Sequence, residues 1–239
     1  MAYTAIDNPG LYFNTIIYTG DGSGATVSGV GFQPDLNITK QRSGTESHFV
    51  VDAVRGVTKT MYTVDTSSTD TYATGLTAFN SDGYVHGDHQ GYATNTETYV
   101  SWNWKESATS GFDIVSFTGN GSARTISHSL SAVPKFYVVK RRNVGDGWIV
   151  YHAGNTSAPE TDHLRLDTTA ATSDDDTKFN DTAPTSSVFS VGTDTSVNGN
   201  TDTYITYLFA PKQGYSKFGS YTGNGDADGT FIYTGFKPR

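Results

Sequence analysis

The sequence predicts an all-β protein of tandem antiparallel β-sandwiches, two complete and the start of a third. Three observations predict this fold. The 239-residue chain has 26 Gly, 13 % aromatic residues and only 17 % charged residues, a composition that favours strands and turns over helices and disorder. Short apolar or alternating segments recur between turn signals, as they do in sandwiches. A unit of about 100 residues occurs twice and then begins again.

The repeat consists of a turn, a proline and an aromatic strand in a fixed order. The Tyr/Phe-Thr-Gly-Asp/Asn-Gly turn at residues 18–22 recurs at residues 117–121 and 221–225. The prolines that follow the turns are Pro34, Pro134 and Pro238. The strand Thr98–Trp104 aligns with Thr203–Phe209. Units of this length are whole domains, because solenoid repeats span only about 20 to 50 residues.

The repeat also sets the expected domain boundaries. Residues 13–105 form β-sandwich 1, residues 106–110 a polar linker and residues 111–211 β-sandwich 2. Residues 1–12 precede the first unit and are expected to form an N-terminal attachment segment. Residues 212–239 are expected to form the opening hairpin of a truncated third sandwich. Because an isolated hairpin is marginal in water, we expect the native protein to continue into a complete third sandwich.

Turn signals place the strands of the first unit. The expected strands are Phe13–Tyr18, Ala25–Ser28, Leu36–Arg42, His48–Val54, Thr60–Val64 and Tyr99–Trp104, with a hairpin at Phe79–Tyr84. The last strand alternates with period two, so Val100, Trp102 and Trp104 lie on one face. Ile205 and Tyr207 take the same places in the second unit. We expect this apolar face to be buried between the two sheets of each sandwich.

The composition excludes several classes of function. No cysteine is present, which rules out disulfides, thiol nucleophiles and zinc–cysteine sites. A net charge of −8 argues against nucleic-acid binding, which needs Lys and Arg against phosphates. No segment approaches 18 apolar residues, and the first residues lack the basic start and apolar run of a secretory signal. We therefore expect no nucleic-acid partner and no membrane insertion.

The sequence indicates no enzyme. Glycoside hydrolysis needs two facing carboxylates, yet Glu occurs only at Glu46, Glu97, Glu106 and Glu160, and no local pair stands at strand spacing. His86 and His89 are close in sequence, but a catalytic zinc usually needs a third protein ligand, so a polar hairpin tip is the favoured interpretation. The Asp174–Asp176 run fits no calcium-loop signature. We expect no catalytic residue, no metal ligand and no cofactor.

Exposed aromatic side chains are the candidate binding residues. Tyr and Trp on loops stack on sugars and make protein contacts at low entropic cost. The candidates are Tyr72, Tyr84, Tyr92, Trp148 and Tyr151. The alternative is that these side chains belong to the sandwich cores, as most aromatic residues of a sandwich do.

Several segments resemble a family of tandem domains of unknown function in tailed-phage proteins, frequent in phages of marine bacteria. These segments are residues 13–20, 31–36, 54–59, 80–83, 99–102, 180–185 and 214–219. The resemblance implies a lectin-like jelly roll, similar to the concanavalin or laminin-G type, carried on the virion. At Asn37 and Thr39 the family usually has apolar or aromatic residues, so we expect the outward face of this strand to differ. The resemblance brings no catalytic residue.

We therefore expect a bacteriophage virion structural protein, made in the host cytoplasm and localised on the virion. A tail fibre or another host-facing adhesin that binds a surface glycan or receptor is favoured, since tandem sandwiches would make a stiff rod whose repeated weak sites gain avidity. The alternatives are a head-decoration or neck protein that binds capsid, and an enzyme that degrades polysaccharide. Expected partners are other virion proteins and further copies of the chain, with a homotrimer as first choice by resemblance to phage fibres.

Overall fold

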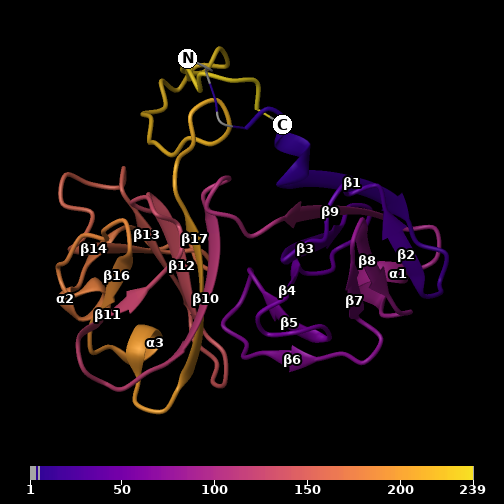
Figure 1. Cartoon of the computed structure of the whole chain (residues 1–239), viewed down its shortest axis with the longest axis horizontal. Helices are drawn as coiled ribbons and strands as arrows, with labels where there is room; N and C mark the ends of the chain where they lie inside the picture. The colour runs from indigo at the N-terminus through magenta and orange to yellow at the C-terminus, as the bar shows by residue number, and fades with distance from the viewer. Residues whose placement is uncertain (1–3, 5, 239) are drawn as a thin grey trace.

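The structure, a computed structural model, describes residues 4 and 6–238. Almost all of its regular structure is strand, and the strands pair antiparallel into several sheets, which confirms the all-β fold (Figure 1). The helices in the described part of the chain are single turns. Figure 1 shows the two halves of the chain side by side, with the C-terminal segment above both.

The first unit is a sandwich of a six-stranded and a three-stranded sheet. Its elements are η1 (Pro9–Leu11), β1 (Phe13–Thr19), β2 (Ala25–Ser28), β3 (Leu36–Gln41), β4 (Phe49–Asp52), β5 (Lys59–Tyr62), β6 (Asp70–Thr71), β7 (Leu76–Asn80), β8 (Gly83–His86), α1 (Gln90–Ala93) and β9 (Thr98–Trp104). The large sheet has the order β1-β9-β3-β4-β5-β6, and the small sheet has the order β2-β8-β7. The strands expected in this unit are present, with β4 and β5 at somewhat different bounds.

The second unit repeats this arrangement. Its elements are β10 (Phe112–Thr118), β11 (Arg124–Ser127), β12 (Phe136–Arg141), β13 (Trp148–His152), β14 (Asp162–Arg165), β15 (Ser173–Asp174), α2 (Asp176–Phe179), β16 (Val188–Val191), α3 (Thr195–Asn198) and β17 (Thr203–Phe209). The large sheet has the order β10-β17-β12-β13-β14-β15, and β11 pairs with β16 in the small sheet. The large sheets of the two units therefore match strand by strand, as the repeat predicts.

The final strand of each unit faces the opposite way from the prediction. Tyr99 and Asn103 of β9 are fully buried inside the sandwich. Trp102 and Trp104, on the other face, are only half-buried. The expectation that Trp102 lies between the sheets is therefore wrong. In β17 both faces are apolar, and the outer face with Tyr207 is covered by the other unit.

The departure from the family pattern at Asn37 and Thr39 lies on the inward face of β3. Asn37 and Asn103 are fully buried. Asn37 donates to Asn103 at 2.8 Å, and the Thr39 hydroxyl donates to Asn37 at 2.8 Å. The expectation of a change on the outward face is therefore wrong.

The two units pack against each other through the outer faces of their large sheets. One apolar cluster joins them: Leu36, Val50 and Met61 come from the first unit, and Phe112, Ile114, Val138, Trp148, Val150, Ile205 and Tyr207 come from the second. The indole N–H of Trp148 donates a hydrogen bond across the interface to the Tyr62 carbonyl oxygen, at 2.7 Å. The sheets thus form a single block of four layers, and the units do not form the end-to-end rod that the sequence suggested.

The repeated turn requires glycine because the backbone of a neighbouring segment approaches it closely. A Cβ at Gly20 would stand 2.5 Å from the carbonyl oxygen of Thr94. A Cβ at Gly119, the matching position in the second unit, would overlap the carbonyl oxygen of Gly199. At Gly223, the third occurrence, a Cβ would meet nothing within 4 Å. The same motif therefore forms a packed turn in two units and an open one in the third.

The segment after β17 contains the third occurrence of the repeated turn, at residues 221–225. A bridge between Lys212 and Ser216 resembles the bridge between Ser107 and Phe112 that precedes β10. The hairpin expected at 212–239 is not formed, since the described residues after this bridge contain no strand. β1 and β10 each pair with the last strand of their own unit, and no such strand accompanies this segment among the described residues. The strongly exposed apolar side chains of the segment are Tyr221, Phe231, Ile232 and Tyr233.

The expected attachment segment, residues 1–12, falls in part on residues outside the description (1–3 and 5). Its described part ends in η1, where the Asn8 side chain accepts a hydrogen bond from the Gly10 amide at 3.0 Å. The Tyr12 ring then contacts the Tyr215 ring edge to face, with the centroids 6.5 Å apart. The beginning and the end of the described chain therefore meet at the same edge of the block (Figure 1).

Candidate functional site

A large cleft lies where the two units and the C-terminal segment meet. Its volume of about 740 Å³ falls in the range of sites that hold a small molecule. We call it the aromatic cleft after the side chains that line it: Phe13, Trp104, Phe112, Phe136, Phe209, Tyr215, Phe218 and Phe236. Such a concentration of rings around one hollow makes the cleft the candidate functional site.

Four of these rings come from matching positions of the two units. Phe13 and Phe112 begin β1 and β10, and Trp104 and Phe209 end β9 and β17. Since these strands pair, Phe13 lies opposite Trp104, with ring centroids 4.9 Å apart. Phe112 lies opposite Phe209 in the same way, at 4.7 Å. The packing of the large sheets then brings Trp104 and Phe209 into edge-to-face contact at 6.5 Å.

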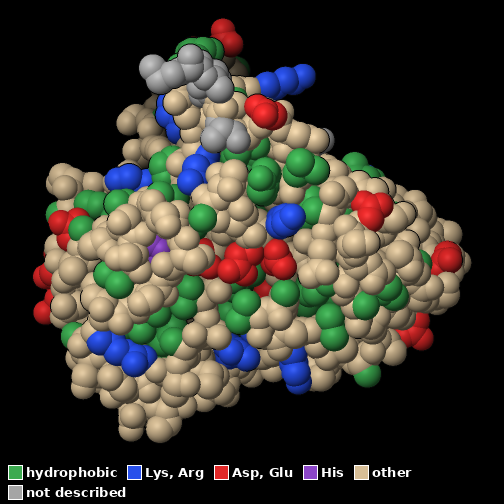
Figure 2. All heavy atoms as spheres, in the orientation of Figure 1, with side chains coloured by type: hydrophobic (Ala, Val, Ile, Leu, Met, Phe, Trp, Pro, Cys, Tyr) green, Lys and Arg blue, Asp and Glu red, His purple; other side chains and the backbone are tan. Residues whose placement is uncertain are grey.

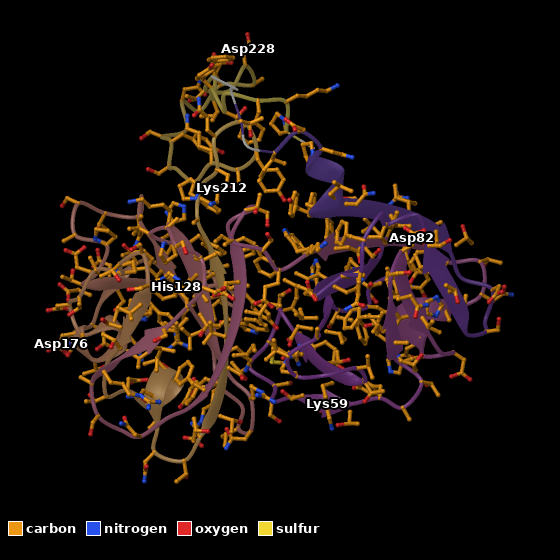
Figure 3. The ribbon with its side chains drawn as sticks, in the orientation of Figure 1. Lys59, Asp82, His128, Asp176, Lys212 and Asp228 are labelled. Carbon is orange, nitrogen blue, oxygen red and sulfur yellow. The ribbon has the colours of Figure 1, made fainter. Side chains whose placement is uncertain are left out.

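The C-terminal segment forms the outer wall of the cleft. Phe218 stacks on Phe136, with ring centroids 6.1 Å apart and ring planes only 7° from parallel. Tyr215 lines the cleft nearby, and burial raises the pKa of its hydroxyl to about 12. Figure 3 shows Lys212 where the segment leaves β17 and Asp228 at the distant tip of the segment. Residues 214–218 and 236–238 of the segment therefore line the cleft, while its tip around Asp228 lies away from it.

The polar groups of the lining are mostly engaged within the protein. The Ser110 hydroxyl donates to the Ser107 carbonyl oxygen, and the Ser216 hydroxyl donates to the Ala210 carbonyl oxygen. Lys217 and Lys237 line the rim and are exposed, and the Lys217 ammonium donates a hydrogen bond to the Tyr233 carbonyl oxygen at 2.8 Å. Figure 2 shows Lys and Arg side chains around the C-terminal segment on the upper part of the molecule. The cleft therefore offers a ligand aromatic faces with positive charge at the rim.

Glu106, in the linker between the units, lies close to acidic side chains of both units. The Glu106 amide donates to a carboxylate oxygen of Asp35 at 2.7 Å. Burial, a hydrogen bond with Asp113 and the negative charges of Asp113, Asp35 and Asp52 raise the pKa of Glu106 to about 8. Figure 2 shows acidic side chains gathered near the line where the two units meet.

All the residues that line the cleft fall within one family match. The model of a family described as a domain of unknown function, DUF7483, matches residues 8–239. The lining runs from Asn8 to Pro238, so the match spans both units and the C-terminal segment. The chain belongs to the DUF7483 family. No curated protein and no solved structure matches it.

In this DUF7483 protein, the five predicted binding residues lie outside the aromatic cleft. Tyr84 and Tyr92 are fully buried in the core of the first unit, Trp148 lies in the interface, and Tyr151 lies in the core of the second unit. Tyr72 is half-buried at the edge of the first core, where its hydroxyl is 2.6 Å from that of Tyr62. The expected exposure is wrong for Tyr84, Tyr92, Trp148 and Tyr151. Three of them lie on strands, where an aromatic side chain fits either face, and Tyr92 lies on the single-turn helix α1 that packs on the first core. The structure brings only Tyr72, Tyr84 and Tyr92 together, in the core of the first unit.

Sequence reasoning missed the aromatic cleft because its residues are distant along the chain. No local motif collects side chains from β1, β9, β10, β12, β17 and the C-terminal segment. One signal was present in the repeat, where Phe13 matches Phe112 and Trp104 matches Phe209 at the same ends of matching strands. In this structure the large sheets pack so that these equal strand ends lie together, and the four aromatic side chains meet at one edge.

His86 and His89, which are close in sequence, have separate structural positions. His89 precedes α1, and its ring nitrogen accepts a hydrogen bond from the Gly91 amide at 3.1 Å. His86 is buried inside the sandwich. Within the described residues, no group of three or more His, Cys, Asp or Glu side chains is placed to hold a metal ion. No helix in this part of the chain is long and apolar enough to cross a membrane.

Proposed function

We propose that this protein is a structural protein of a phage virion that acts as a host-facing adhesin and binds a surface glycan in the aromatic cleft. The observation that carries the proposal is the cleft itself, a hollow of about 740 Å³ walled by rings from both units and from the C-terminal segment. The virion location rests on the resemblance of the repeated segments to tailed-phage proteins.

The chemistry of the cleft favours a sugar with acidic substituents. The C–H faces of a sugar ring pack on aromatic side chains, while its polar edges remain available for hydrogen bonds. Lys217 and Lys237 at the rim supply positive charge for carboxylate or phosphate substituents. The protein as a whole has a net charge of −8, so this local charge would direct an acidic glycan to the rim.

The cleft favours binding over catalysis. Hydrolysis of a glycosidic bond requires two carboxyl groups on either side of the bond. The described residues that line the cleft include no Asp, Glu or His. A glycan held there would meet rings, serines and lysines, which can orient it but supply no acid–base pair.

Binding of acidic polysaccharides on an array tests the adhesin. The array carries purified bacterial surface polysaccharides, both acidic and neutral. We expect the wild-type chain to bind at least one acidic polysaccharide, and Phe218→Ala together with Phe236→Ala to weaken that binding by about ten-fold or more. Phe231→Ala is the matched control, because Phe231 lies in the same segment but is 86 % exposed and outside the cleft. If the double variant of Phe218 and Phe236 bound as tightly as the Phe231→Ala control, the glycan site would lie outside the aromatic cleft.

A second candidate function is attachment of the chain to another virion protein, as in a head-decoration or neck protein. The observation that favours it is the exposed apolar group on the tip of the C-terminal segment, where Tyr221 and Tyr233 are each 70 % exposed. Immunogold labelling of particles of the phage that carries the gene distinguishes the two. Label at the tail tip or fibres supports the adhesin, and label on the head or neck supports the second candidate.

The oligomeric state on the particle is a separate part of the proposal. We propose a homotrimer, with other virion proteins as neighbours, by resemblance to phage fibres. Native mass spectrometry of the protein released from particles tests this, and a monomer would contradict it.

A further inference from the structure

The chain contains three Asn-Gly dipeptides, at residues 120–121, 198–199 and 224–225. Asparagine is among the chemically labile residues of proteins, and its side chain can react with the next backbone amide. A following glycine favours this reaction, because it has no Cβ to hinder the approach of the amide nitrogen. Two of the three pairs lie in copies of the repeated turn with the same sequence, Thr-Gly-Asn-Gly, so their surroundings in the fold can be compared directly.

The two turns have the same local conformation. The Asn120 side-chain oxygen accepts a hydrogen bond from the Ser122 amide at 3.0 Å, and that of Asn224 accepts one from the Asp226 amide at 3.1 Å. The φ angles of the following glycines are 71° and 72°. A difference in reactivity between the two asparagines must therefore come from what surrounds each turn.

The turn of the second unit is held by a neighbouring segment. The Gly121 amide, which would be the attacking group, donates a hydrogen bond to the Asn198 carbonyl oxygen at 2.8 Å. The Asn198 side-chain amide donates to the Asn120 side-chain oxygen at 3.3 Å and to the Ser122 carbonyl oxygen at 2.7 Å. Reaction at Asn120 would first require these hydrogen bonds to break.

The pair at residues 198–199 is also fixed. Asn198 is fully buried, and its side-chain amide donates to the Gly192 carbonyl oxygen at 2.8 Å. The Gly199 amide donates to the Tyr204 hydroxyl at 2.7 Å. Neither the attacking nitrogen nor the asparagine side chain of this pair is free to move.

The turn of the C-terminal segment lacks such restraints. Residues 219–233 are all exposed, and a Cβ at Gly225 would meet nothing within 4 Å. Among the described residues, the Gly225 amide donates no hydrogen bond. The Asn224 side-chain amide donates to the Asp228 carbonyl oxygen at 3.0 Å, within the same exposed loop. Water competes for such a contact, so it restrains the side chain only weakly.

We propose that Asn224 is a site of spontaneous deamidation, with the Gly225 amide nitrogen as the nucleophile. The nitrogen loses its proton to hydroxide and forms a bond to Asn224 Cγ. The bond from Cγ to Nδ2 then breaks, and Nδ2 takes a proton from water and leaves as ammonia. The product is a five-membered cyclic imide. Water opens this ring at one of its two carbonyl carbons, which gives either aspartate or isoaspartate.

The modification would change the tip of the C-terminal segment. It adds a negative charge next to Asp226 and Asp228, and isoaspartate also lengthens the backbone of the turn by one methylene group. The same tip carries the exposed ring of Tyr221. This site goes beyond the proposed function and shares no residue with the aromatic cleft, so either proposal can fail alone.

Peptide mapping by mass spectrometry tests the site. The purified full chain is incubated at slightly alkaline pH, digested with trypsin at intervals and probed for isoaspartate with protein isoaspartyl methyltransferase. Arg124, Lys178 and Lys212 separate the three pairs, so each falls in a different tryptic peptide. We expect deamidation at Asn224 to be about ten-fold or more faster than at Asn120 or Asn198, because only Asn224 reacts without local opening of the fold.

Two controls separate the effect of the fold from that of the sequence. In guanidinium chloride, Asn120 and Asn224 have the same neighbours in the turn and should react at similar rates. Gly225→Ala places a Cβ beside the attacking nitrogen and should slow the reaction at Asn224 in the folded chain. Deamidation of Asn120 as fast as that of Asn224 in the folded chain, or no isoaspartate at Asn224, would overturn the proposal. An unchanged rate in Gly225→Ala would overturn the role of the Gly225 amide.

Discussion

Removing the hydroxyl of Tyr207 is a direct perturbation of the contact between the two units. This hydroxyl, on β17 of the second unit, donates to a carboxylate oxygen of Asp52 at 2.6 Å, at the end of β4 in the first unit. The same carboxylate oxygen accepts from Arg55 Nε at 2.5 Å, and the side chains of the Asp52–Arg55 ion pair have no exposed surface. Arg55 also donates to the carbonyl oxygens of Val50 and Lys59. A buried charge pair is thus completed by a group from the other unit.

The expected cost follows from this geometry. Tyr207→Phe deletes one hydrogen bond to a buried carboxylate and leaves the ion pair in place, which should lower the free energy of unfolding by about 1.5 to 3 kcal/mol. For a chain of this size that corresponds to a fall in melting temperature of roughly 3 to 12 °C. Asp52→Asn removes the partner charge of Arg55 and should cost more, about 3 to 5 kcal/mol.

Urea unfolding and differential scanning calorimetry measure both values. Tyr221→Phe is the matched control, since the Tyr221 ring is 70 % exposed and its variant should stay within about 0.5 kcal/mol of wild type. If Tyr207→Phe also stayed within about 0.5 kcal/mol of wild type, the hydroxyl would face water and the packing of the large sheets described above would be refuted.

Three further results are expected. Gly119→Ala should destabilise the chain by about 1 to 3 kcal/mol in urea unfolding because its Cβ would overlap the Gly199 carbonyl, whereas Gly223→Ala should change little; similar values for the two would refute the role of the close approach. Because folding raises the pKa of Glu106 from 4.5 to about 8, the folded state binds more protons than the unfolded state in this range, so stability from this group falls as pH rises through it. Glu106→Gln should remove that fall, so the melting temperature of this variant minus that of wild type should increase from pH 5 to pH 8. Glu160→Gln controls for the loss of a carboxylate elsewhere. If the difference between Glu106→Gln and wild type were the same at every pH, the raised pKa of Glu106 would be contradicted. Trp148→Phe loses the hydrogen bond to the Tyr62 carbonyl and should cost about 1 to 3 kcal/mol by the same unfolding assay, while a neutral effect would again argue against the interface.

The sequence was informative about strands because turns and period-two alternation are local signals. The first and last residues of β1, β2, β3 and β9 follow from glycine-rich turns and from the alternation of residues. The identical order of the large sheets follows from the repeat. Such local signals predict strands and turns directly, because each residue type favours a particular conformation of its own backbone.

The burial of each strand face could not be predicted in the same way. Alternation in β9 shows that Trp102 and Trp104 share a face, but not whether a sheet of the same unit or another unit covers it. The Tyr99 face, with Ser101 and Asn103, is the more polar one, yet it is the one inside the sandwich. Only the packing of one unit on the other explains why the aromatic face is outside.

The location of the candidate site could not be predicted either, because it also depends on how the two units pack on each other. Tyr84 and Trp148 were expected on loops, but they are core and interface residues. The cleft forms from strand ends that are about 100 residues apart in the chain and meet only after the units have packed. Comparison of the strand ends of the two repeats, as well as of their turns, would have indicated Phe13, Trp104, Phe112 and Phe209 as candidate site residues.

The most direct test of the central claim, that the aromatic cleft binds the glycan, is fluorine NMR of protein labelled with 5-fluorotryptophan. The chain has three tryptophans. Trp104 lines the cleft, Trp148 is buried in the interface, and Trp102 lies on the outer face of β9 outside the cleft. Addition of the acidic polysaccharide selected on the array should shift the Trp104 resonance and leave those of Trp102 and Trp148 in place. A shift confined to Trp102, or no shift at saturation, would contradict the claim.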